Sequence, residues 1–228
     1  MKNRFIITVD GPAGAGKTTV SKILADRLAY KYIDTGALYR GIAFAARRKE
    51  ISPENDHDLE NLCNSIVMKF VRSEKGLRLL LNHSDITENI RTSEISMLAS
   101  AVSARPIVRN YLLSIQRAMG HEKGVVFEGR DMGTVVFPEA EVKFFLHASE
   151  KKRALRRYKE LASQTSKTLA EVEKDINRRD KNDSSRSIAP LKPAKDAIQI
   201  DSTNISIKDV VALMLAYVKG VCSFDIHV

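Results

Sequence analysis

A phosphate-binding loop near the start of the chain constrains its fold more than any other feature. Residues 11–18 read G-P-A-G-A-G-K-T, which fits the pattern G-x-x-x-x-G-K-[ST], and the apolar run at residues 5–9 predicts a short buried strand before the loop. A predicted helix follows from residue 18 to about residue 28, and a strand, loop and helix in this order are typical of nucleoside-triphosphate sites. A glycine-rich turn that binds no ligand is the alternative, and the flanking strand and helix argue against it.

Each part of the loop has a physical task at a triphosphate. Glycines let the backbone curl until successive N–H groups point at phosphate oxygens, and the helix aims the positive end of its dipole at the same phosphates. Lys17 reaches the β- and γ-phosphates as a point charge, and the hydroxyl of Thr18 is a ligand for Mg²⁺. The expected triphosphate contacts are Gly11, Pro12, Ala13, Gly14, Ala15, Gly16, Lys17 and Thr18.

The length and composition fit one α/β domain with smaller insertions, because 228 residues with 43% hydrophobic content can bury a substantial core. The apolar run after Met1 is too short for a signal peptide, and no other run approaches the length of a membrane span. Cys63 and Cys222 fall in no paired motif. We therefore expect reduced thiols, a cytoplasmic location and no membrane partner.

The order of the predicted elements indicates a doubly wound α/β fold with a five-stranded parallel sheet. A helix from residue 94 to about 119 should break or kink at Pro106. The runs 66–71 and 77–81 predict a β-hairpin, and the polar tract 180–193 predicts an exposed loop. Strands are predicted at 5–9, 32–36, 124–128, 142–146 and 197–200, and helices at 18–28, 37–50, 149–162, 169–179 and 207–218.

The formal net charge of +9 suggests anionic partners, and its distribution is uneven. Residues 147–186 carry 12 Lys and Arg against 7 Asp and Glu, a net charge of +5 in about one sixth of the chain. A solvated basic helix face explains much of this excess, and nucleotides, nucleic acid or an anionic membrane could each balance it. The chain has only 6% aromatic residues and no Trp, which argues against stacking on nucleic-acid bases.

Several arginines form a second set of candidate phosphate ligands. They lie near predicted element ends or loops, where ligand-binding groups of α/β sheets concentrate, and a guanidinium grips phosphate bidentately. Any one of them could instead be a surface or capping residue, so their convergence in space decides between the two readings. The candidates are Arg40, Arg109, Arg130, Arg179 and Arg186.

Two acids follow the predicted strand at 124–128. Glu128 could bind Mg²⁺ through water and Asp131 could accept from a donor group on a substrate, although an acidic turn at a strand end is the simpler alternative. Arg153 and Arg157 are spaced i,i+4 on one face of the basic helix, where they could cover the triphosphate or form a solvated face.

Beyond the loop, three further blocks of the chain resemble the bacterial cytidylate kinases, which are nucleoside-monophosphate kinases. The blocks are D-T-G-A-L-Y-R at 34–40, G-R-D-M-G-T-V-V-F-P at 129–138, and residues 179–186 followed by A-P-L at 189–191. The resemblance covers nearly all of the chain, and the predicted hairpin matches an insertion that separates this family from the adenylate kinases.

The resemblance implies transfer of phosphate from ATP to CMP or dCMP, with Mg²⁺ as cofactor. It implies a P-loop core at 1–34, 105–147 and 188–228, a monophosphate-binding domain at 35–104 with a β-rich insertion at about 62–92, and a basic helical lid at 148–187. It adds Thr19 to the ATP contacts, together with Arg153 and Arg157. We expect Lys17, Arg130, Arg157 and Arg179 to act on the transferred phosphate.

The resemblance also implies the residues that bind CMP. Arg40 and Arg130 would hold the monophosphate, Arg179 and Asp183 would lie near the ribose, and Arg186 near phosphate. Ser100, Arg109 and Asp131 match positions that read cytosine, whose amino donor and ring acceptors complement a carboxylate and a guanidinium. Thr35 and Tyr39 complete the expected CMP contacts.

The chain departs from the family pattern at two places. Glu128 stands where the family block usually has Asp, and Lys181, Ser184 and Ser185 stand where some relatives carry further arginines. Two other functions stay open: a P-loop kinase for another acceptor such as UMP or dTMP, and a nucleotide-dependent nucleic-acid-binding protein. We expect a monomer without a nucleic-acid partner, while the preference between CMP and dCMP and the role of residues 221–228 stay open.

Overall fold

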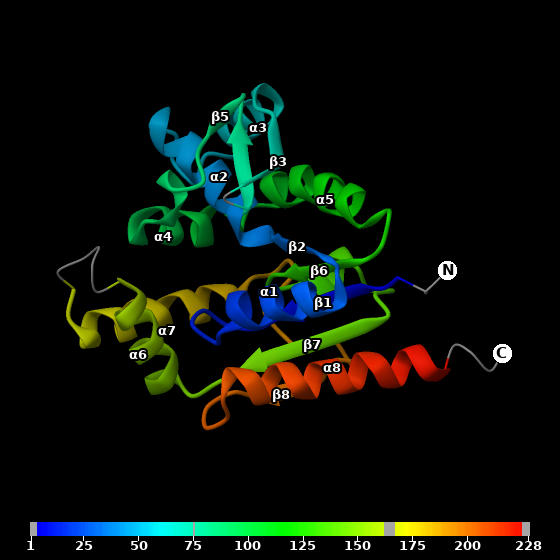
Figure 1. Ribbon diagram of the computed structural model, residues 1–228. Coiled ribbons are helices and arrows are strands. Elements are labelled where there is room, and N and C mark those ends of the chain that lie inside the picture. The colour runs from blue at the N-terminus through cyan, green and yellow to red at the C-terminus, as the bar shows by residue number, and fades with distance from the viewer. Residues whose placement is uncertain (1–3, 75, 162–166, 225–228) are drawn as a thin grey trace. The chain divides into compact units, whose positions relative to one another are not determined.

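The chain folds into two compact units, which are described separately here. The computed structural model describes residues 4–74, 76–161 and 167–224. One unit contains residues 1–33 and 119–228, and the other contains residues 34–118 (Figure 1). Residues 105–118 thus belong to the second unit, whereas we expected the P-loop core to resume at 105. The functional division into core, monophosphate-binding domain and lid stays a prediction.

The first unit is built on a five-stranded sheet with the strand order β2-β6-β1-β7-β8. Strand β1 pairs in parallel with β6 and β7, and β7 pairs in parallel with β8, so the predicted doubly wound parallel sheet is confirmed. The elements of this unit are β1 (Ile6–Asp10), α1 (Lys17–Leu28), β2 (Lys31–Asp34), β6 (Val125–Glu128), the one-turn π-helix η2 (Met132–Val136), β7 (Val142–His147), α6 (Glu150–Leu161), α7 (Leu169–Ser185), β8 (Ile198–Asp201) and α8 (Ile207–Phe224).

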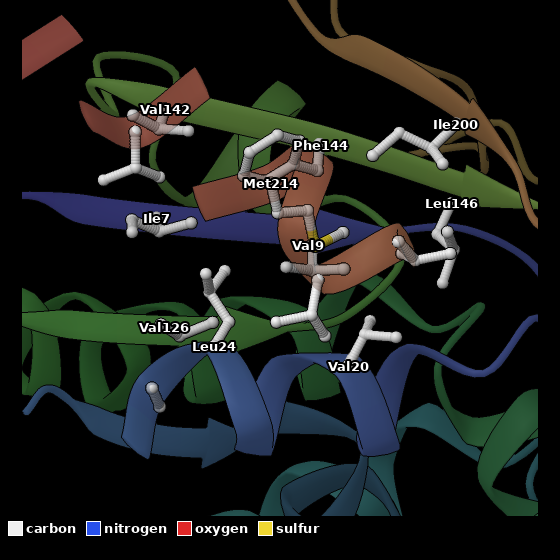
Figure 2. Close-up of a cluster of buried hydrophobic side chains, with 14 of the residues drawn as sticks. Ile7, Val9, Val20, Leu24, Val126, Val142, Phe144, Leu146, Ile200 and Met214 are labelled. Carbon is white, nitrogen blue, oxygen red and sulfur yellow. The ribbon is translucent and has the colours of Figure 1, made fainter. Parts of the chain in front are cut away.

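The main core of this unit lies on the sheet face that α1 and α8 cover. Alternate residues of β1 point to this face, so Ile7 and Val9 pack there while Thr8 between them points away. Leu24 of α1 and Met214 of α8 meet the strands from the helix side (Figure 2). Burial of this face stabilises the sheet and sets the register of its strands. The register in turn sets the position of the edge at which the strands end.

The carboxyl ends of the central strands form the edge that carries the candidate site. The phosphate-binding loop follows β1 directly, Glu128 ends β6, and His147 ends β7. Parallel strands bring these ends together, and ligands of open α/β sheets bind at this edge.

Helices α6 and α7 pack on each other through a small core of their own, formed by Ala154, Val172 and Ile176. The N-terminus of α7 is fixed by a capping box, in which Thr168 and Glu171 each satisfy the other's backbone N–H. The residue expected to end α6, Ala162, lies outside the described residues.

The expectation of an exposed loop over residues 180–193 is wrong in its first part. Helix α7 continues to Ser185, and Asp183 within this stretch is only 2% exposed. Three arginines lie around the Asp183 carboxylate. The Ser184 hydroxyl donates a hydrogen bond to the Asp180 carbonyl at 2.7 Å. Tertiary charge pairing therefore offsets the low helix propensity of Asp, Asn and Ser in this tract.

The second unit combines helices with a three-stranded antiparallel sheet of order β3-β4-β5. The predicted hairpin is confirmed, with Met68 opposite Leu81, and the break at Pro106 falls between α4 and α5. The sequence did not predict α3 or the short strand β5. The elements are α2 (Thr35–Arg48), α3 (Asp56–Ser65), β3 (Met68–Ser73), β4 (Gly76–Leu81), β5 (Ser84–Asp85), the 3-10 turn η1 (Asn89–Arg91), α4 (Ser93–Val102) and α5 (Pro106–Gly120), whose last residues cross the unit boundary.

Among the described residues, no helix has the length and apolar character needed to span a membrane.

Adjacent positions on α8 test the assigned core. Met214 is fully buried against the sheet, whereas its neighbour Leu213 is 56% exposed. We expect Met214→Ala to lower the free energy of unfolding by about 2–5 kcal/mol, because the deletion leaves a cavity. Leu213→Ala should cost less than about 1 kcal/mol. Urea denaturation of the two variants measures the difference, and equal losses would contradict this packing of α8.

Candidate active site

The backbone of the phosphate-binding loop takes a conformation that requires glycine at two points. Gly11 has φ of +145°, and a Cβ there would lie 1.9 Å from the Leu146 carbonyl oxygen. Gly14 has φ of +72°, and its Cβ would lie 2.8 Å from the Arg153 carbonyl oxygen. The loop therefore passes close to β7 and α6, and a side chain at either glycine would push it away.

Carbonyl groups of the loop are held from outside by two arginines and a serine. Arg153 is buried and donates to Ala148 O and Ala13 O, each at 3.0 Å, and it also pairs with Asp180 of α7. Arg156 donates to Ala15 O at 3.2 Å. These bonds fix the loop before any ligand arrives, which lowers the ordering cost of binding.

Ser202, directly after β8, completes this support. Its hydroxyl donates to Ala15 O at 3.0 Å, and it accepts from Arg156 Nη1 at 3.0 Å. The sequence analysis did not single out Arg156 or Ser202. Their partners lie 141 and 187 residues away in the chain, so no local pattern marks them.

Lys17 is buried at the start of α1, where its ammonium donates to Pro12 O at 2.7 Å. Burial, and then repulsion by Arg130 and Arg179, lowers the pKa of Lys17 to about 7, against the attraction of Glu128 and Asp10. Lys17 thus interacts electrostatically with Arg130, Arg179 and Glu128. A phosphate placed here would relieve the repulsion among the cations.

Glu128 ties three elements together at this edge. Its Oε1 accepts from the Thr18 hydroxyl of α1 at 2.9 Å, and its Oε2 accepts from the Tyr32 hydroxyl of β2 at 2.6 Å. A hydroxyl and a carboxylate are hard oxygen ligands that suit Mg²⁺, which keeps several waters and takes few protein ligands. In the part of the chain that the structure describes, no group of three or more His, Cys, Asp or Glu is arranged for a metal.

Three arginines of the first unit lie around the carboxylate of Asp183 on α7. Arg130 Nε donates to its Oδ2 at 3.1 Å, while Arg179 Nε and Arg186 Nη1 lie 3.9 Å from its carboxylate oxygens. Burial alone would raise the pKa of Asp183, but Arg130, Arg179 and Arg186 hold it below its usual range. Three of the predicted phosphate ligands thus converge on one buried carboxylate.

Asp131 follows Arg130 and is 2% exposed, directly before η2. The turn that carries it is pinned to β1 by Asp10, whose carboxylate accepts from Met132 N at 2.9 Å and from Gly133 N at 2.8 Å. Burial raises the pKa of Asp10 to about 7, although these two N–H groups and Lys17 oppose the rise. Sequence reasoning missed Asp10; an acid that ends an apolar strand just before the loop was the available signal.

The second unit places its candidate residues on α2, α4 and α5. Arg40 Nη2 donates to Asp34 Oδ2 at 2.6 Å, and Asp34 Oδ1 caps α2 by accepting from Ala37 N at 3.2 Å. Asp34 therefore orients Arg40, a role that the sequence analysis did not assign. Thr35, next to Asp34, is buried at the first turn of the helix.

Arg109 of α5 joins the other two helices. Its guanidinium carbon lies 5.6 Å from the centre of the Tyr39 ring, a cation–π distance, and its Nη1 donates to Ser103 O at 3.1 Å. The Ser103 hydroxyl in turn donates to Ser100 O at 2.8 Å. Ser100, Tyr39 and Arg109 are thus brought together within this unit, and Ser100 and Arg109 are both buried.

The structure collects the predicted residues into two groups. The first unit brings Lys17, Thr18, Glu128, Arg130 and Arg179 together; the second unit brings together Tyr39, Ser100 and Arg109. Arg157 joins neither group and donates to Glu160 on its own helix at 3.0 Å, whereas Arg153 and Arg156 contact the loop. The ligand assigned to each residue stays a prediction.

Comparison with known proteins gives close sequence relatives over nearly the whole chain. The sequence profile of the family described as cytidylate kinase matches residues 7–220. The cytidylate kinase of Geobacter sulfurreducens is 50% identical over 216 residues, covering 94% of this chain and 93% of that protein. The cytidylate kinase of Halalkalibacterium halodurans is 44% identical, covering 93% of this chain and 96% of that protein.

Among solved structures, a shikimate kinase from Acinetobacter baumannii in complex with shikimate is similar in fold. Its TM-score is 0.50 at 13% sequence identity, with 96% of this chain and 95% of that chain covered. At this identity the likeness shows the fold alone, and it agrees with the P-loop architecture described above.

Binding of a nucleoside triphosphate should be coupled to proton uptake by Lys17. The pKa of the free group is about 7, and phosphate oxygens around the ammonium favour its charged form, so binding should raise that pKa. At pH 8 we expect roughly 0.5 to 1 proton to be taken up per triphosphate bound, and less at pH 6, where Lys17 already carries its proton. Titration calorimetry in buffers of different ionisation enthalpy measures this number.

Lys17→Met is the control for this proton count, because it keeps the length of the side chain and removes the titrating group. Uptake should vanish in this variant. The same uptake in Lys17→Met and in the unmodified protein would assign the proton to another group.

Proposed function

This chain belongs to the cytidylate kinase family, and we propose that it transfers the γ-phosphate of ATP to CMP or dCMP, giving ADP and CDP or dCDP. The observation that carries the proposal is the family match over residues 7–220, which spans both groups of candidate residues. A phosphate-binding loop alone would fit many P-loop proteins, whereas a second set of buried arginines suits a second phosphate-bearing ligand.

The donor end of the reaction is assigned to the first unit. The backbone N–H groups of the loop and Lys17 would bind the phosphates of ATP, with Gly16 and Thr19 at the start of α1. Thr18 and Glu128 would hold Mg²⁺, Glu128 through water, because they present the hydroxyl and carboxylate that this cation prefers. When bound, the ion neutralises charge on the β- and γ-phosphates.

The acceptor end is assigned to the remaining candidate residues. Arg40 and Arg130 would exchange their present carboxylate partners for the monophosphate of CMP, which is the stronger bidentate ligand. Asp131 would accept a hydrogen bond from the amino group of cytosine. Arg109 and Ser100 would contact the other polar atoms of the base. Arg179 and Asp183 are assigned to the ribose, Arg186 to phosphate, and Thr35 and Tyr39 to the nucleotide as a whole.

Phosphoryl transfer needs positioning and charge stabilisation more than covalent help from the protein. We assign charge stabilisation of the transferred group to Lys17, Arg130 and Arg179, whose mutual proximity the pKa shift of Lys17 reflects. Arg157 could join them only by leaving Glu160, with which it is paired. The assignment requires no general base, since the attacking phosphate oxygen of CMP is already ionised.

The basic segment 148–187 is assigned the task of excluding water, which would otherwise compete with CMP for the transferred phosphate. We also propose that the enzyme acts as a monomer in the cytoplasm; buried Cys63, a free thiol, is compatible with a reducing compartment. Binding to RNA or DNA that outcompetes CMP would instead favour the nucleic-acid-binding alternative.

A panel of nucleoside monophosphates with ATP and Mg²⁺ tests the reaction directly. We expect CMP and dCMP to give rapid ADP formation and UMP and dTMP to give much less, because an unpaired buried carboxylate disfavours uracil. Lys17→Ala should lower turnover at least about 100-fold. ADP formation with CMP no faster than without an acceptor, alongside rapid formation with UMP or dTMP, would replace cytidylate by another acceptor.

Asp131→Asn tests the reading of cytosine. The amide can donate to the O4 of uracil, so the ratio of kcat/KM for CMP over UMP should fall by about 10- to 100-fold. The control is Asp26→Asn on the exposed surface of α1, which should leave the ratio unchanged. A ratio that stays the same in Asp131→Asn would remove this residue from base recognition.

A further inference from the structure

Asp10 is a buried acid to which neither the family resemblance nor the proposed reaction assigns a task. It ends β1, directly before Gly11, and only 4% of it is exposed. Its two carboxylate oxygens each accept one backbone N–H, from Met132 at 2.9 Å and from Gly133 at 2.8 Å. One side chain thus joins the residue before the phosphate-binding loop to the turn after Asp131.

A carboxylate is a costly choice at this position. Burial, helped by repulsion from Asp131, raises the pKa of Asp10 to about 7, so a neutral side chain would be easier to bury. A neutral side chain could not accept two N–H groups with two equivalent oxygens, because an amide presents one acceptor and one donor. The bidentate geometry therefore needs the acid.

The turn that Asp10 holds has an unusual backbone and lies very close to β1. Residues 132–136 form one turn of π-helix, in which Phe137 N donates to Met132 O at 2.7 Å. Single π-turns often occur at functional sites. A Cβ on Gly133 would lie 2.9 Å from Thr8 Oγ1, so the contact between turn and strand leaves no space for a side chain.

The backbone carbonyl groups of the phosphate-binding loop, in contrast, are held by residues other than Asp10. They are held by Arg153 at Ala13, by Arg156 and Ser202 at Ala15, and by Lys17 at Pro12. Loss of the Asp10 carboxylate should therefore disturb the turn at 131–136 much more than the loop.

We propose that Asp10 is a positioning residue for the acceptor nucleotide, whose carboxylate fixes the turn at Met132 and Gly133 and thereby aims Asp131 and Arg130 at the base and phosphate of CMP. The proposal rests on the proposed function for the tasks of Asp131 and Arg130. In this role Asp10 acts on the acceptor through the backbone of the turn, to which both of its carboxylate oxygens are bonded.

Asp10→Asn tests this role with steady-state kinetics for ATP, CMP and UMP. We expect kcat/KM for CMP to fall by about tenfold or more, mostly through KM, because one N–H of the turn then faces an amide donor. The ratio of kcat/KM for CMP over UMP should fall at least about fivefold, while KM for ATP changes less than about threefold. This ratio is independent of the fraction of folded enzyme, so a merely structural defect would not move it.

Glu141→Gln is the matched control. Glu141 accepts from Ile6 N at 2.8 Å, at the opposite end of the same strand, and it also pairs with Lys123. It performs the same kind of anchoring away from the site. This variant should keep the CMP over UMP ratio and both KM values.

Gly133→Ala provides a second route if Asp10→Asn does not fold. It leaves the charge of Asp10 in place and displaces the turn by contact with Thr8, so it should lower the same ratio. The proposal is overturned if soluble Asp10→Asn or Gly133→Ala loses activity with CMP and UMP equally, or loses none. An unmodified protein that does not phosphorylate CMP would instead overturn the proposed function.

Discussion

The mutual repulsion of cations held close together is the constraint on which the site depends. Lys17 is buried near Arg130 and Arg179, and both arginines lower its pKa. Asp183 balances the arginines from the other side, with Arg130 in direct contact and Arg179 and Arg186 at 3.9 Å. A buried charge is tolerated only when it is paired, and one carboxylate serves three guanidinium groups here. Lys17, Arg130 and Arg179 thus lie close enough to repel one another, and phosphate groups bound among them would relieve that repulsion.

Contacts with the phosphate-binding loop account for part of the positive charge of helix α6. Its charge suggested a surface for an anionic partner, yet Arg153 is 4% exposed and Arg156 is bonded to the loop and to Ser202. A guanidinium suits this work because its planar fork can reach several acceptors at once, as Arg153 does at Ala148, Ala13 and Asp180. Part of the positive charge between 147 and 186 is therefore structural, and it supports the shape of the loop instead of attracting a partner from solution.

The features that the sequence predicted correctly are those with local causes. The glycine pattern of the loop, the strand runs, the hairpin closed at Gly76 and the helix break at Pro106 each follow from a few neighbouring residues. The error at α7 and the missed role of Asp10 have distant causes. Helix α7 continues past Arg179 because Arg130, 53 residues earlier, pairs with Asp183. Asp10 holds a turn more than 120 residues away, so its role could not be derived from spacing. The ligand assigned to each residue stays a prediction, because it depends on contacts with bound nucleotides and not on contacts within the chain.

Glu128 shows how one departure from the family pattern can be accommodated. The resemblance implies Asp at this position, and the additional methylene of Glu extends the carboxylate from β6. Its two oxygens then reach Thr18 on α1 and Tyr32 on the neighbouring edge strand β2. If Thr18 and Glu128 hold Mg²⁺ as proposed, the Thr18 hydroxyl and, through water, the Glu128 carboxylate would serve the cation. The hydrogen bond from Tyr32 to Oε2 would orient the carboxylate for that role.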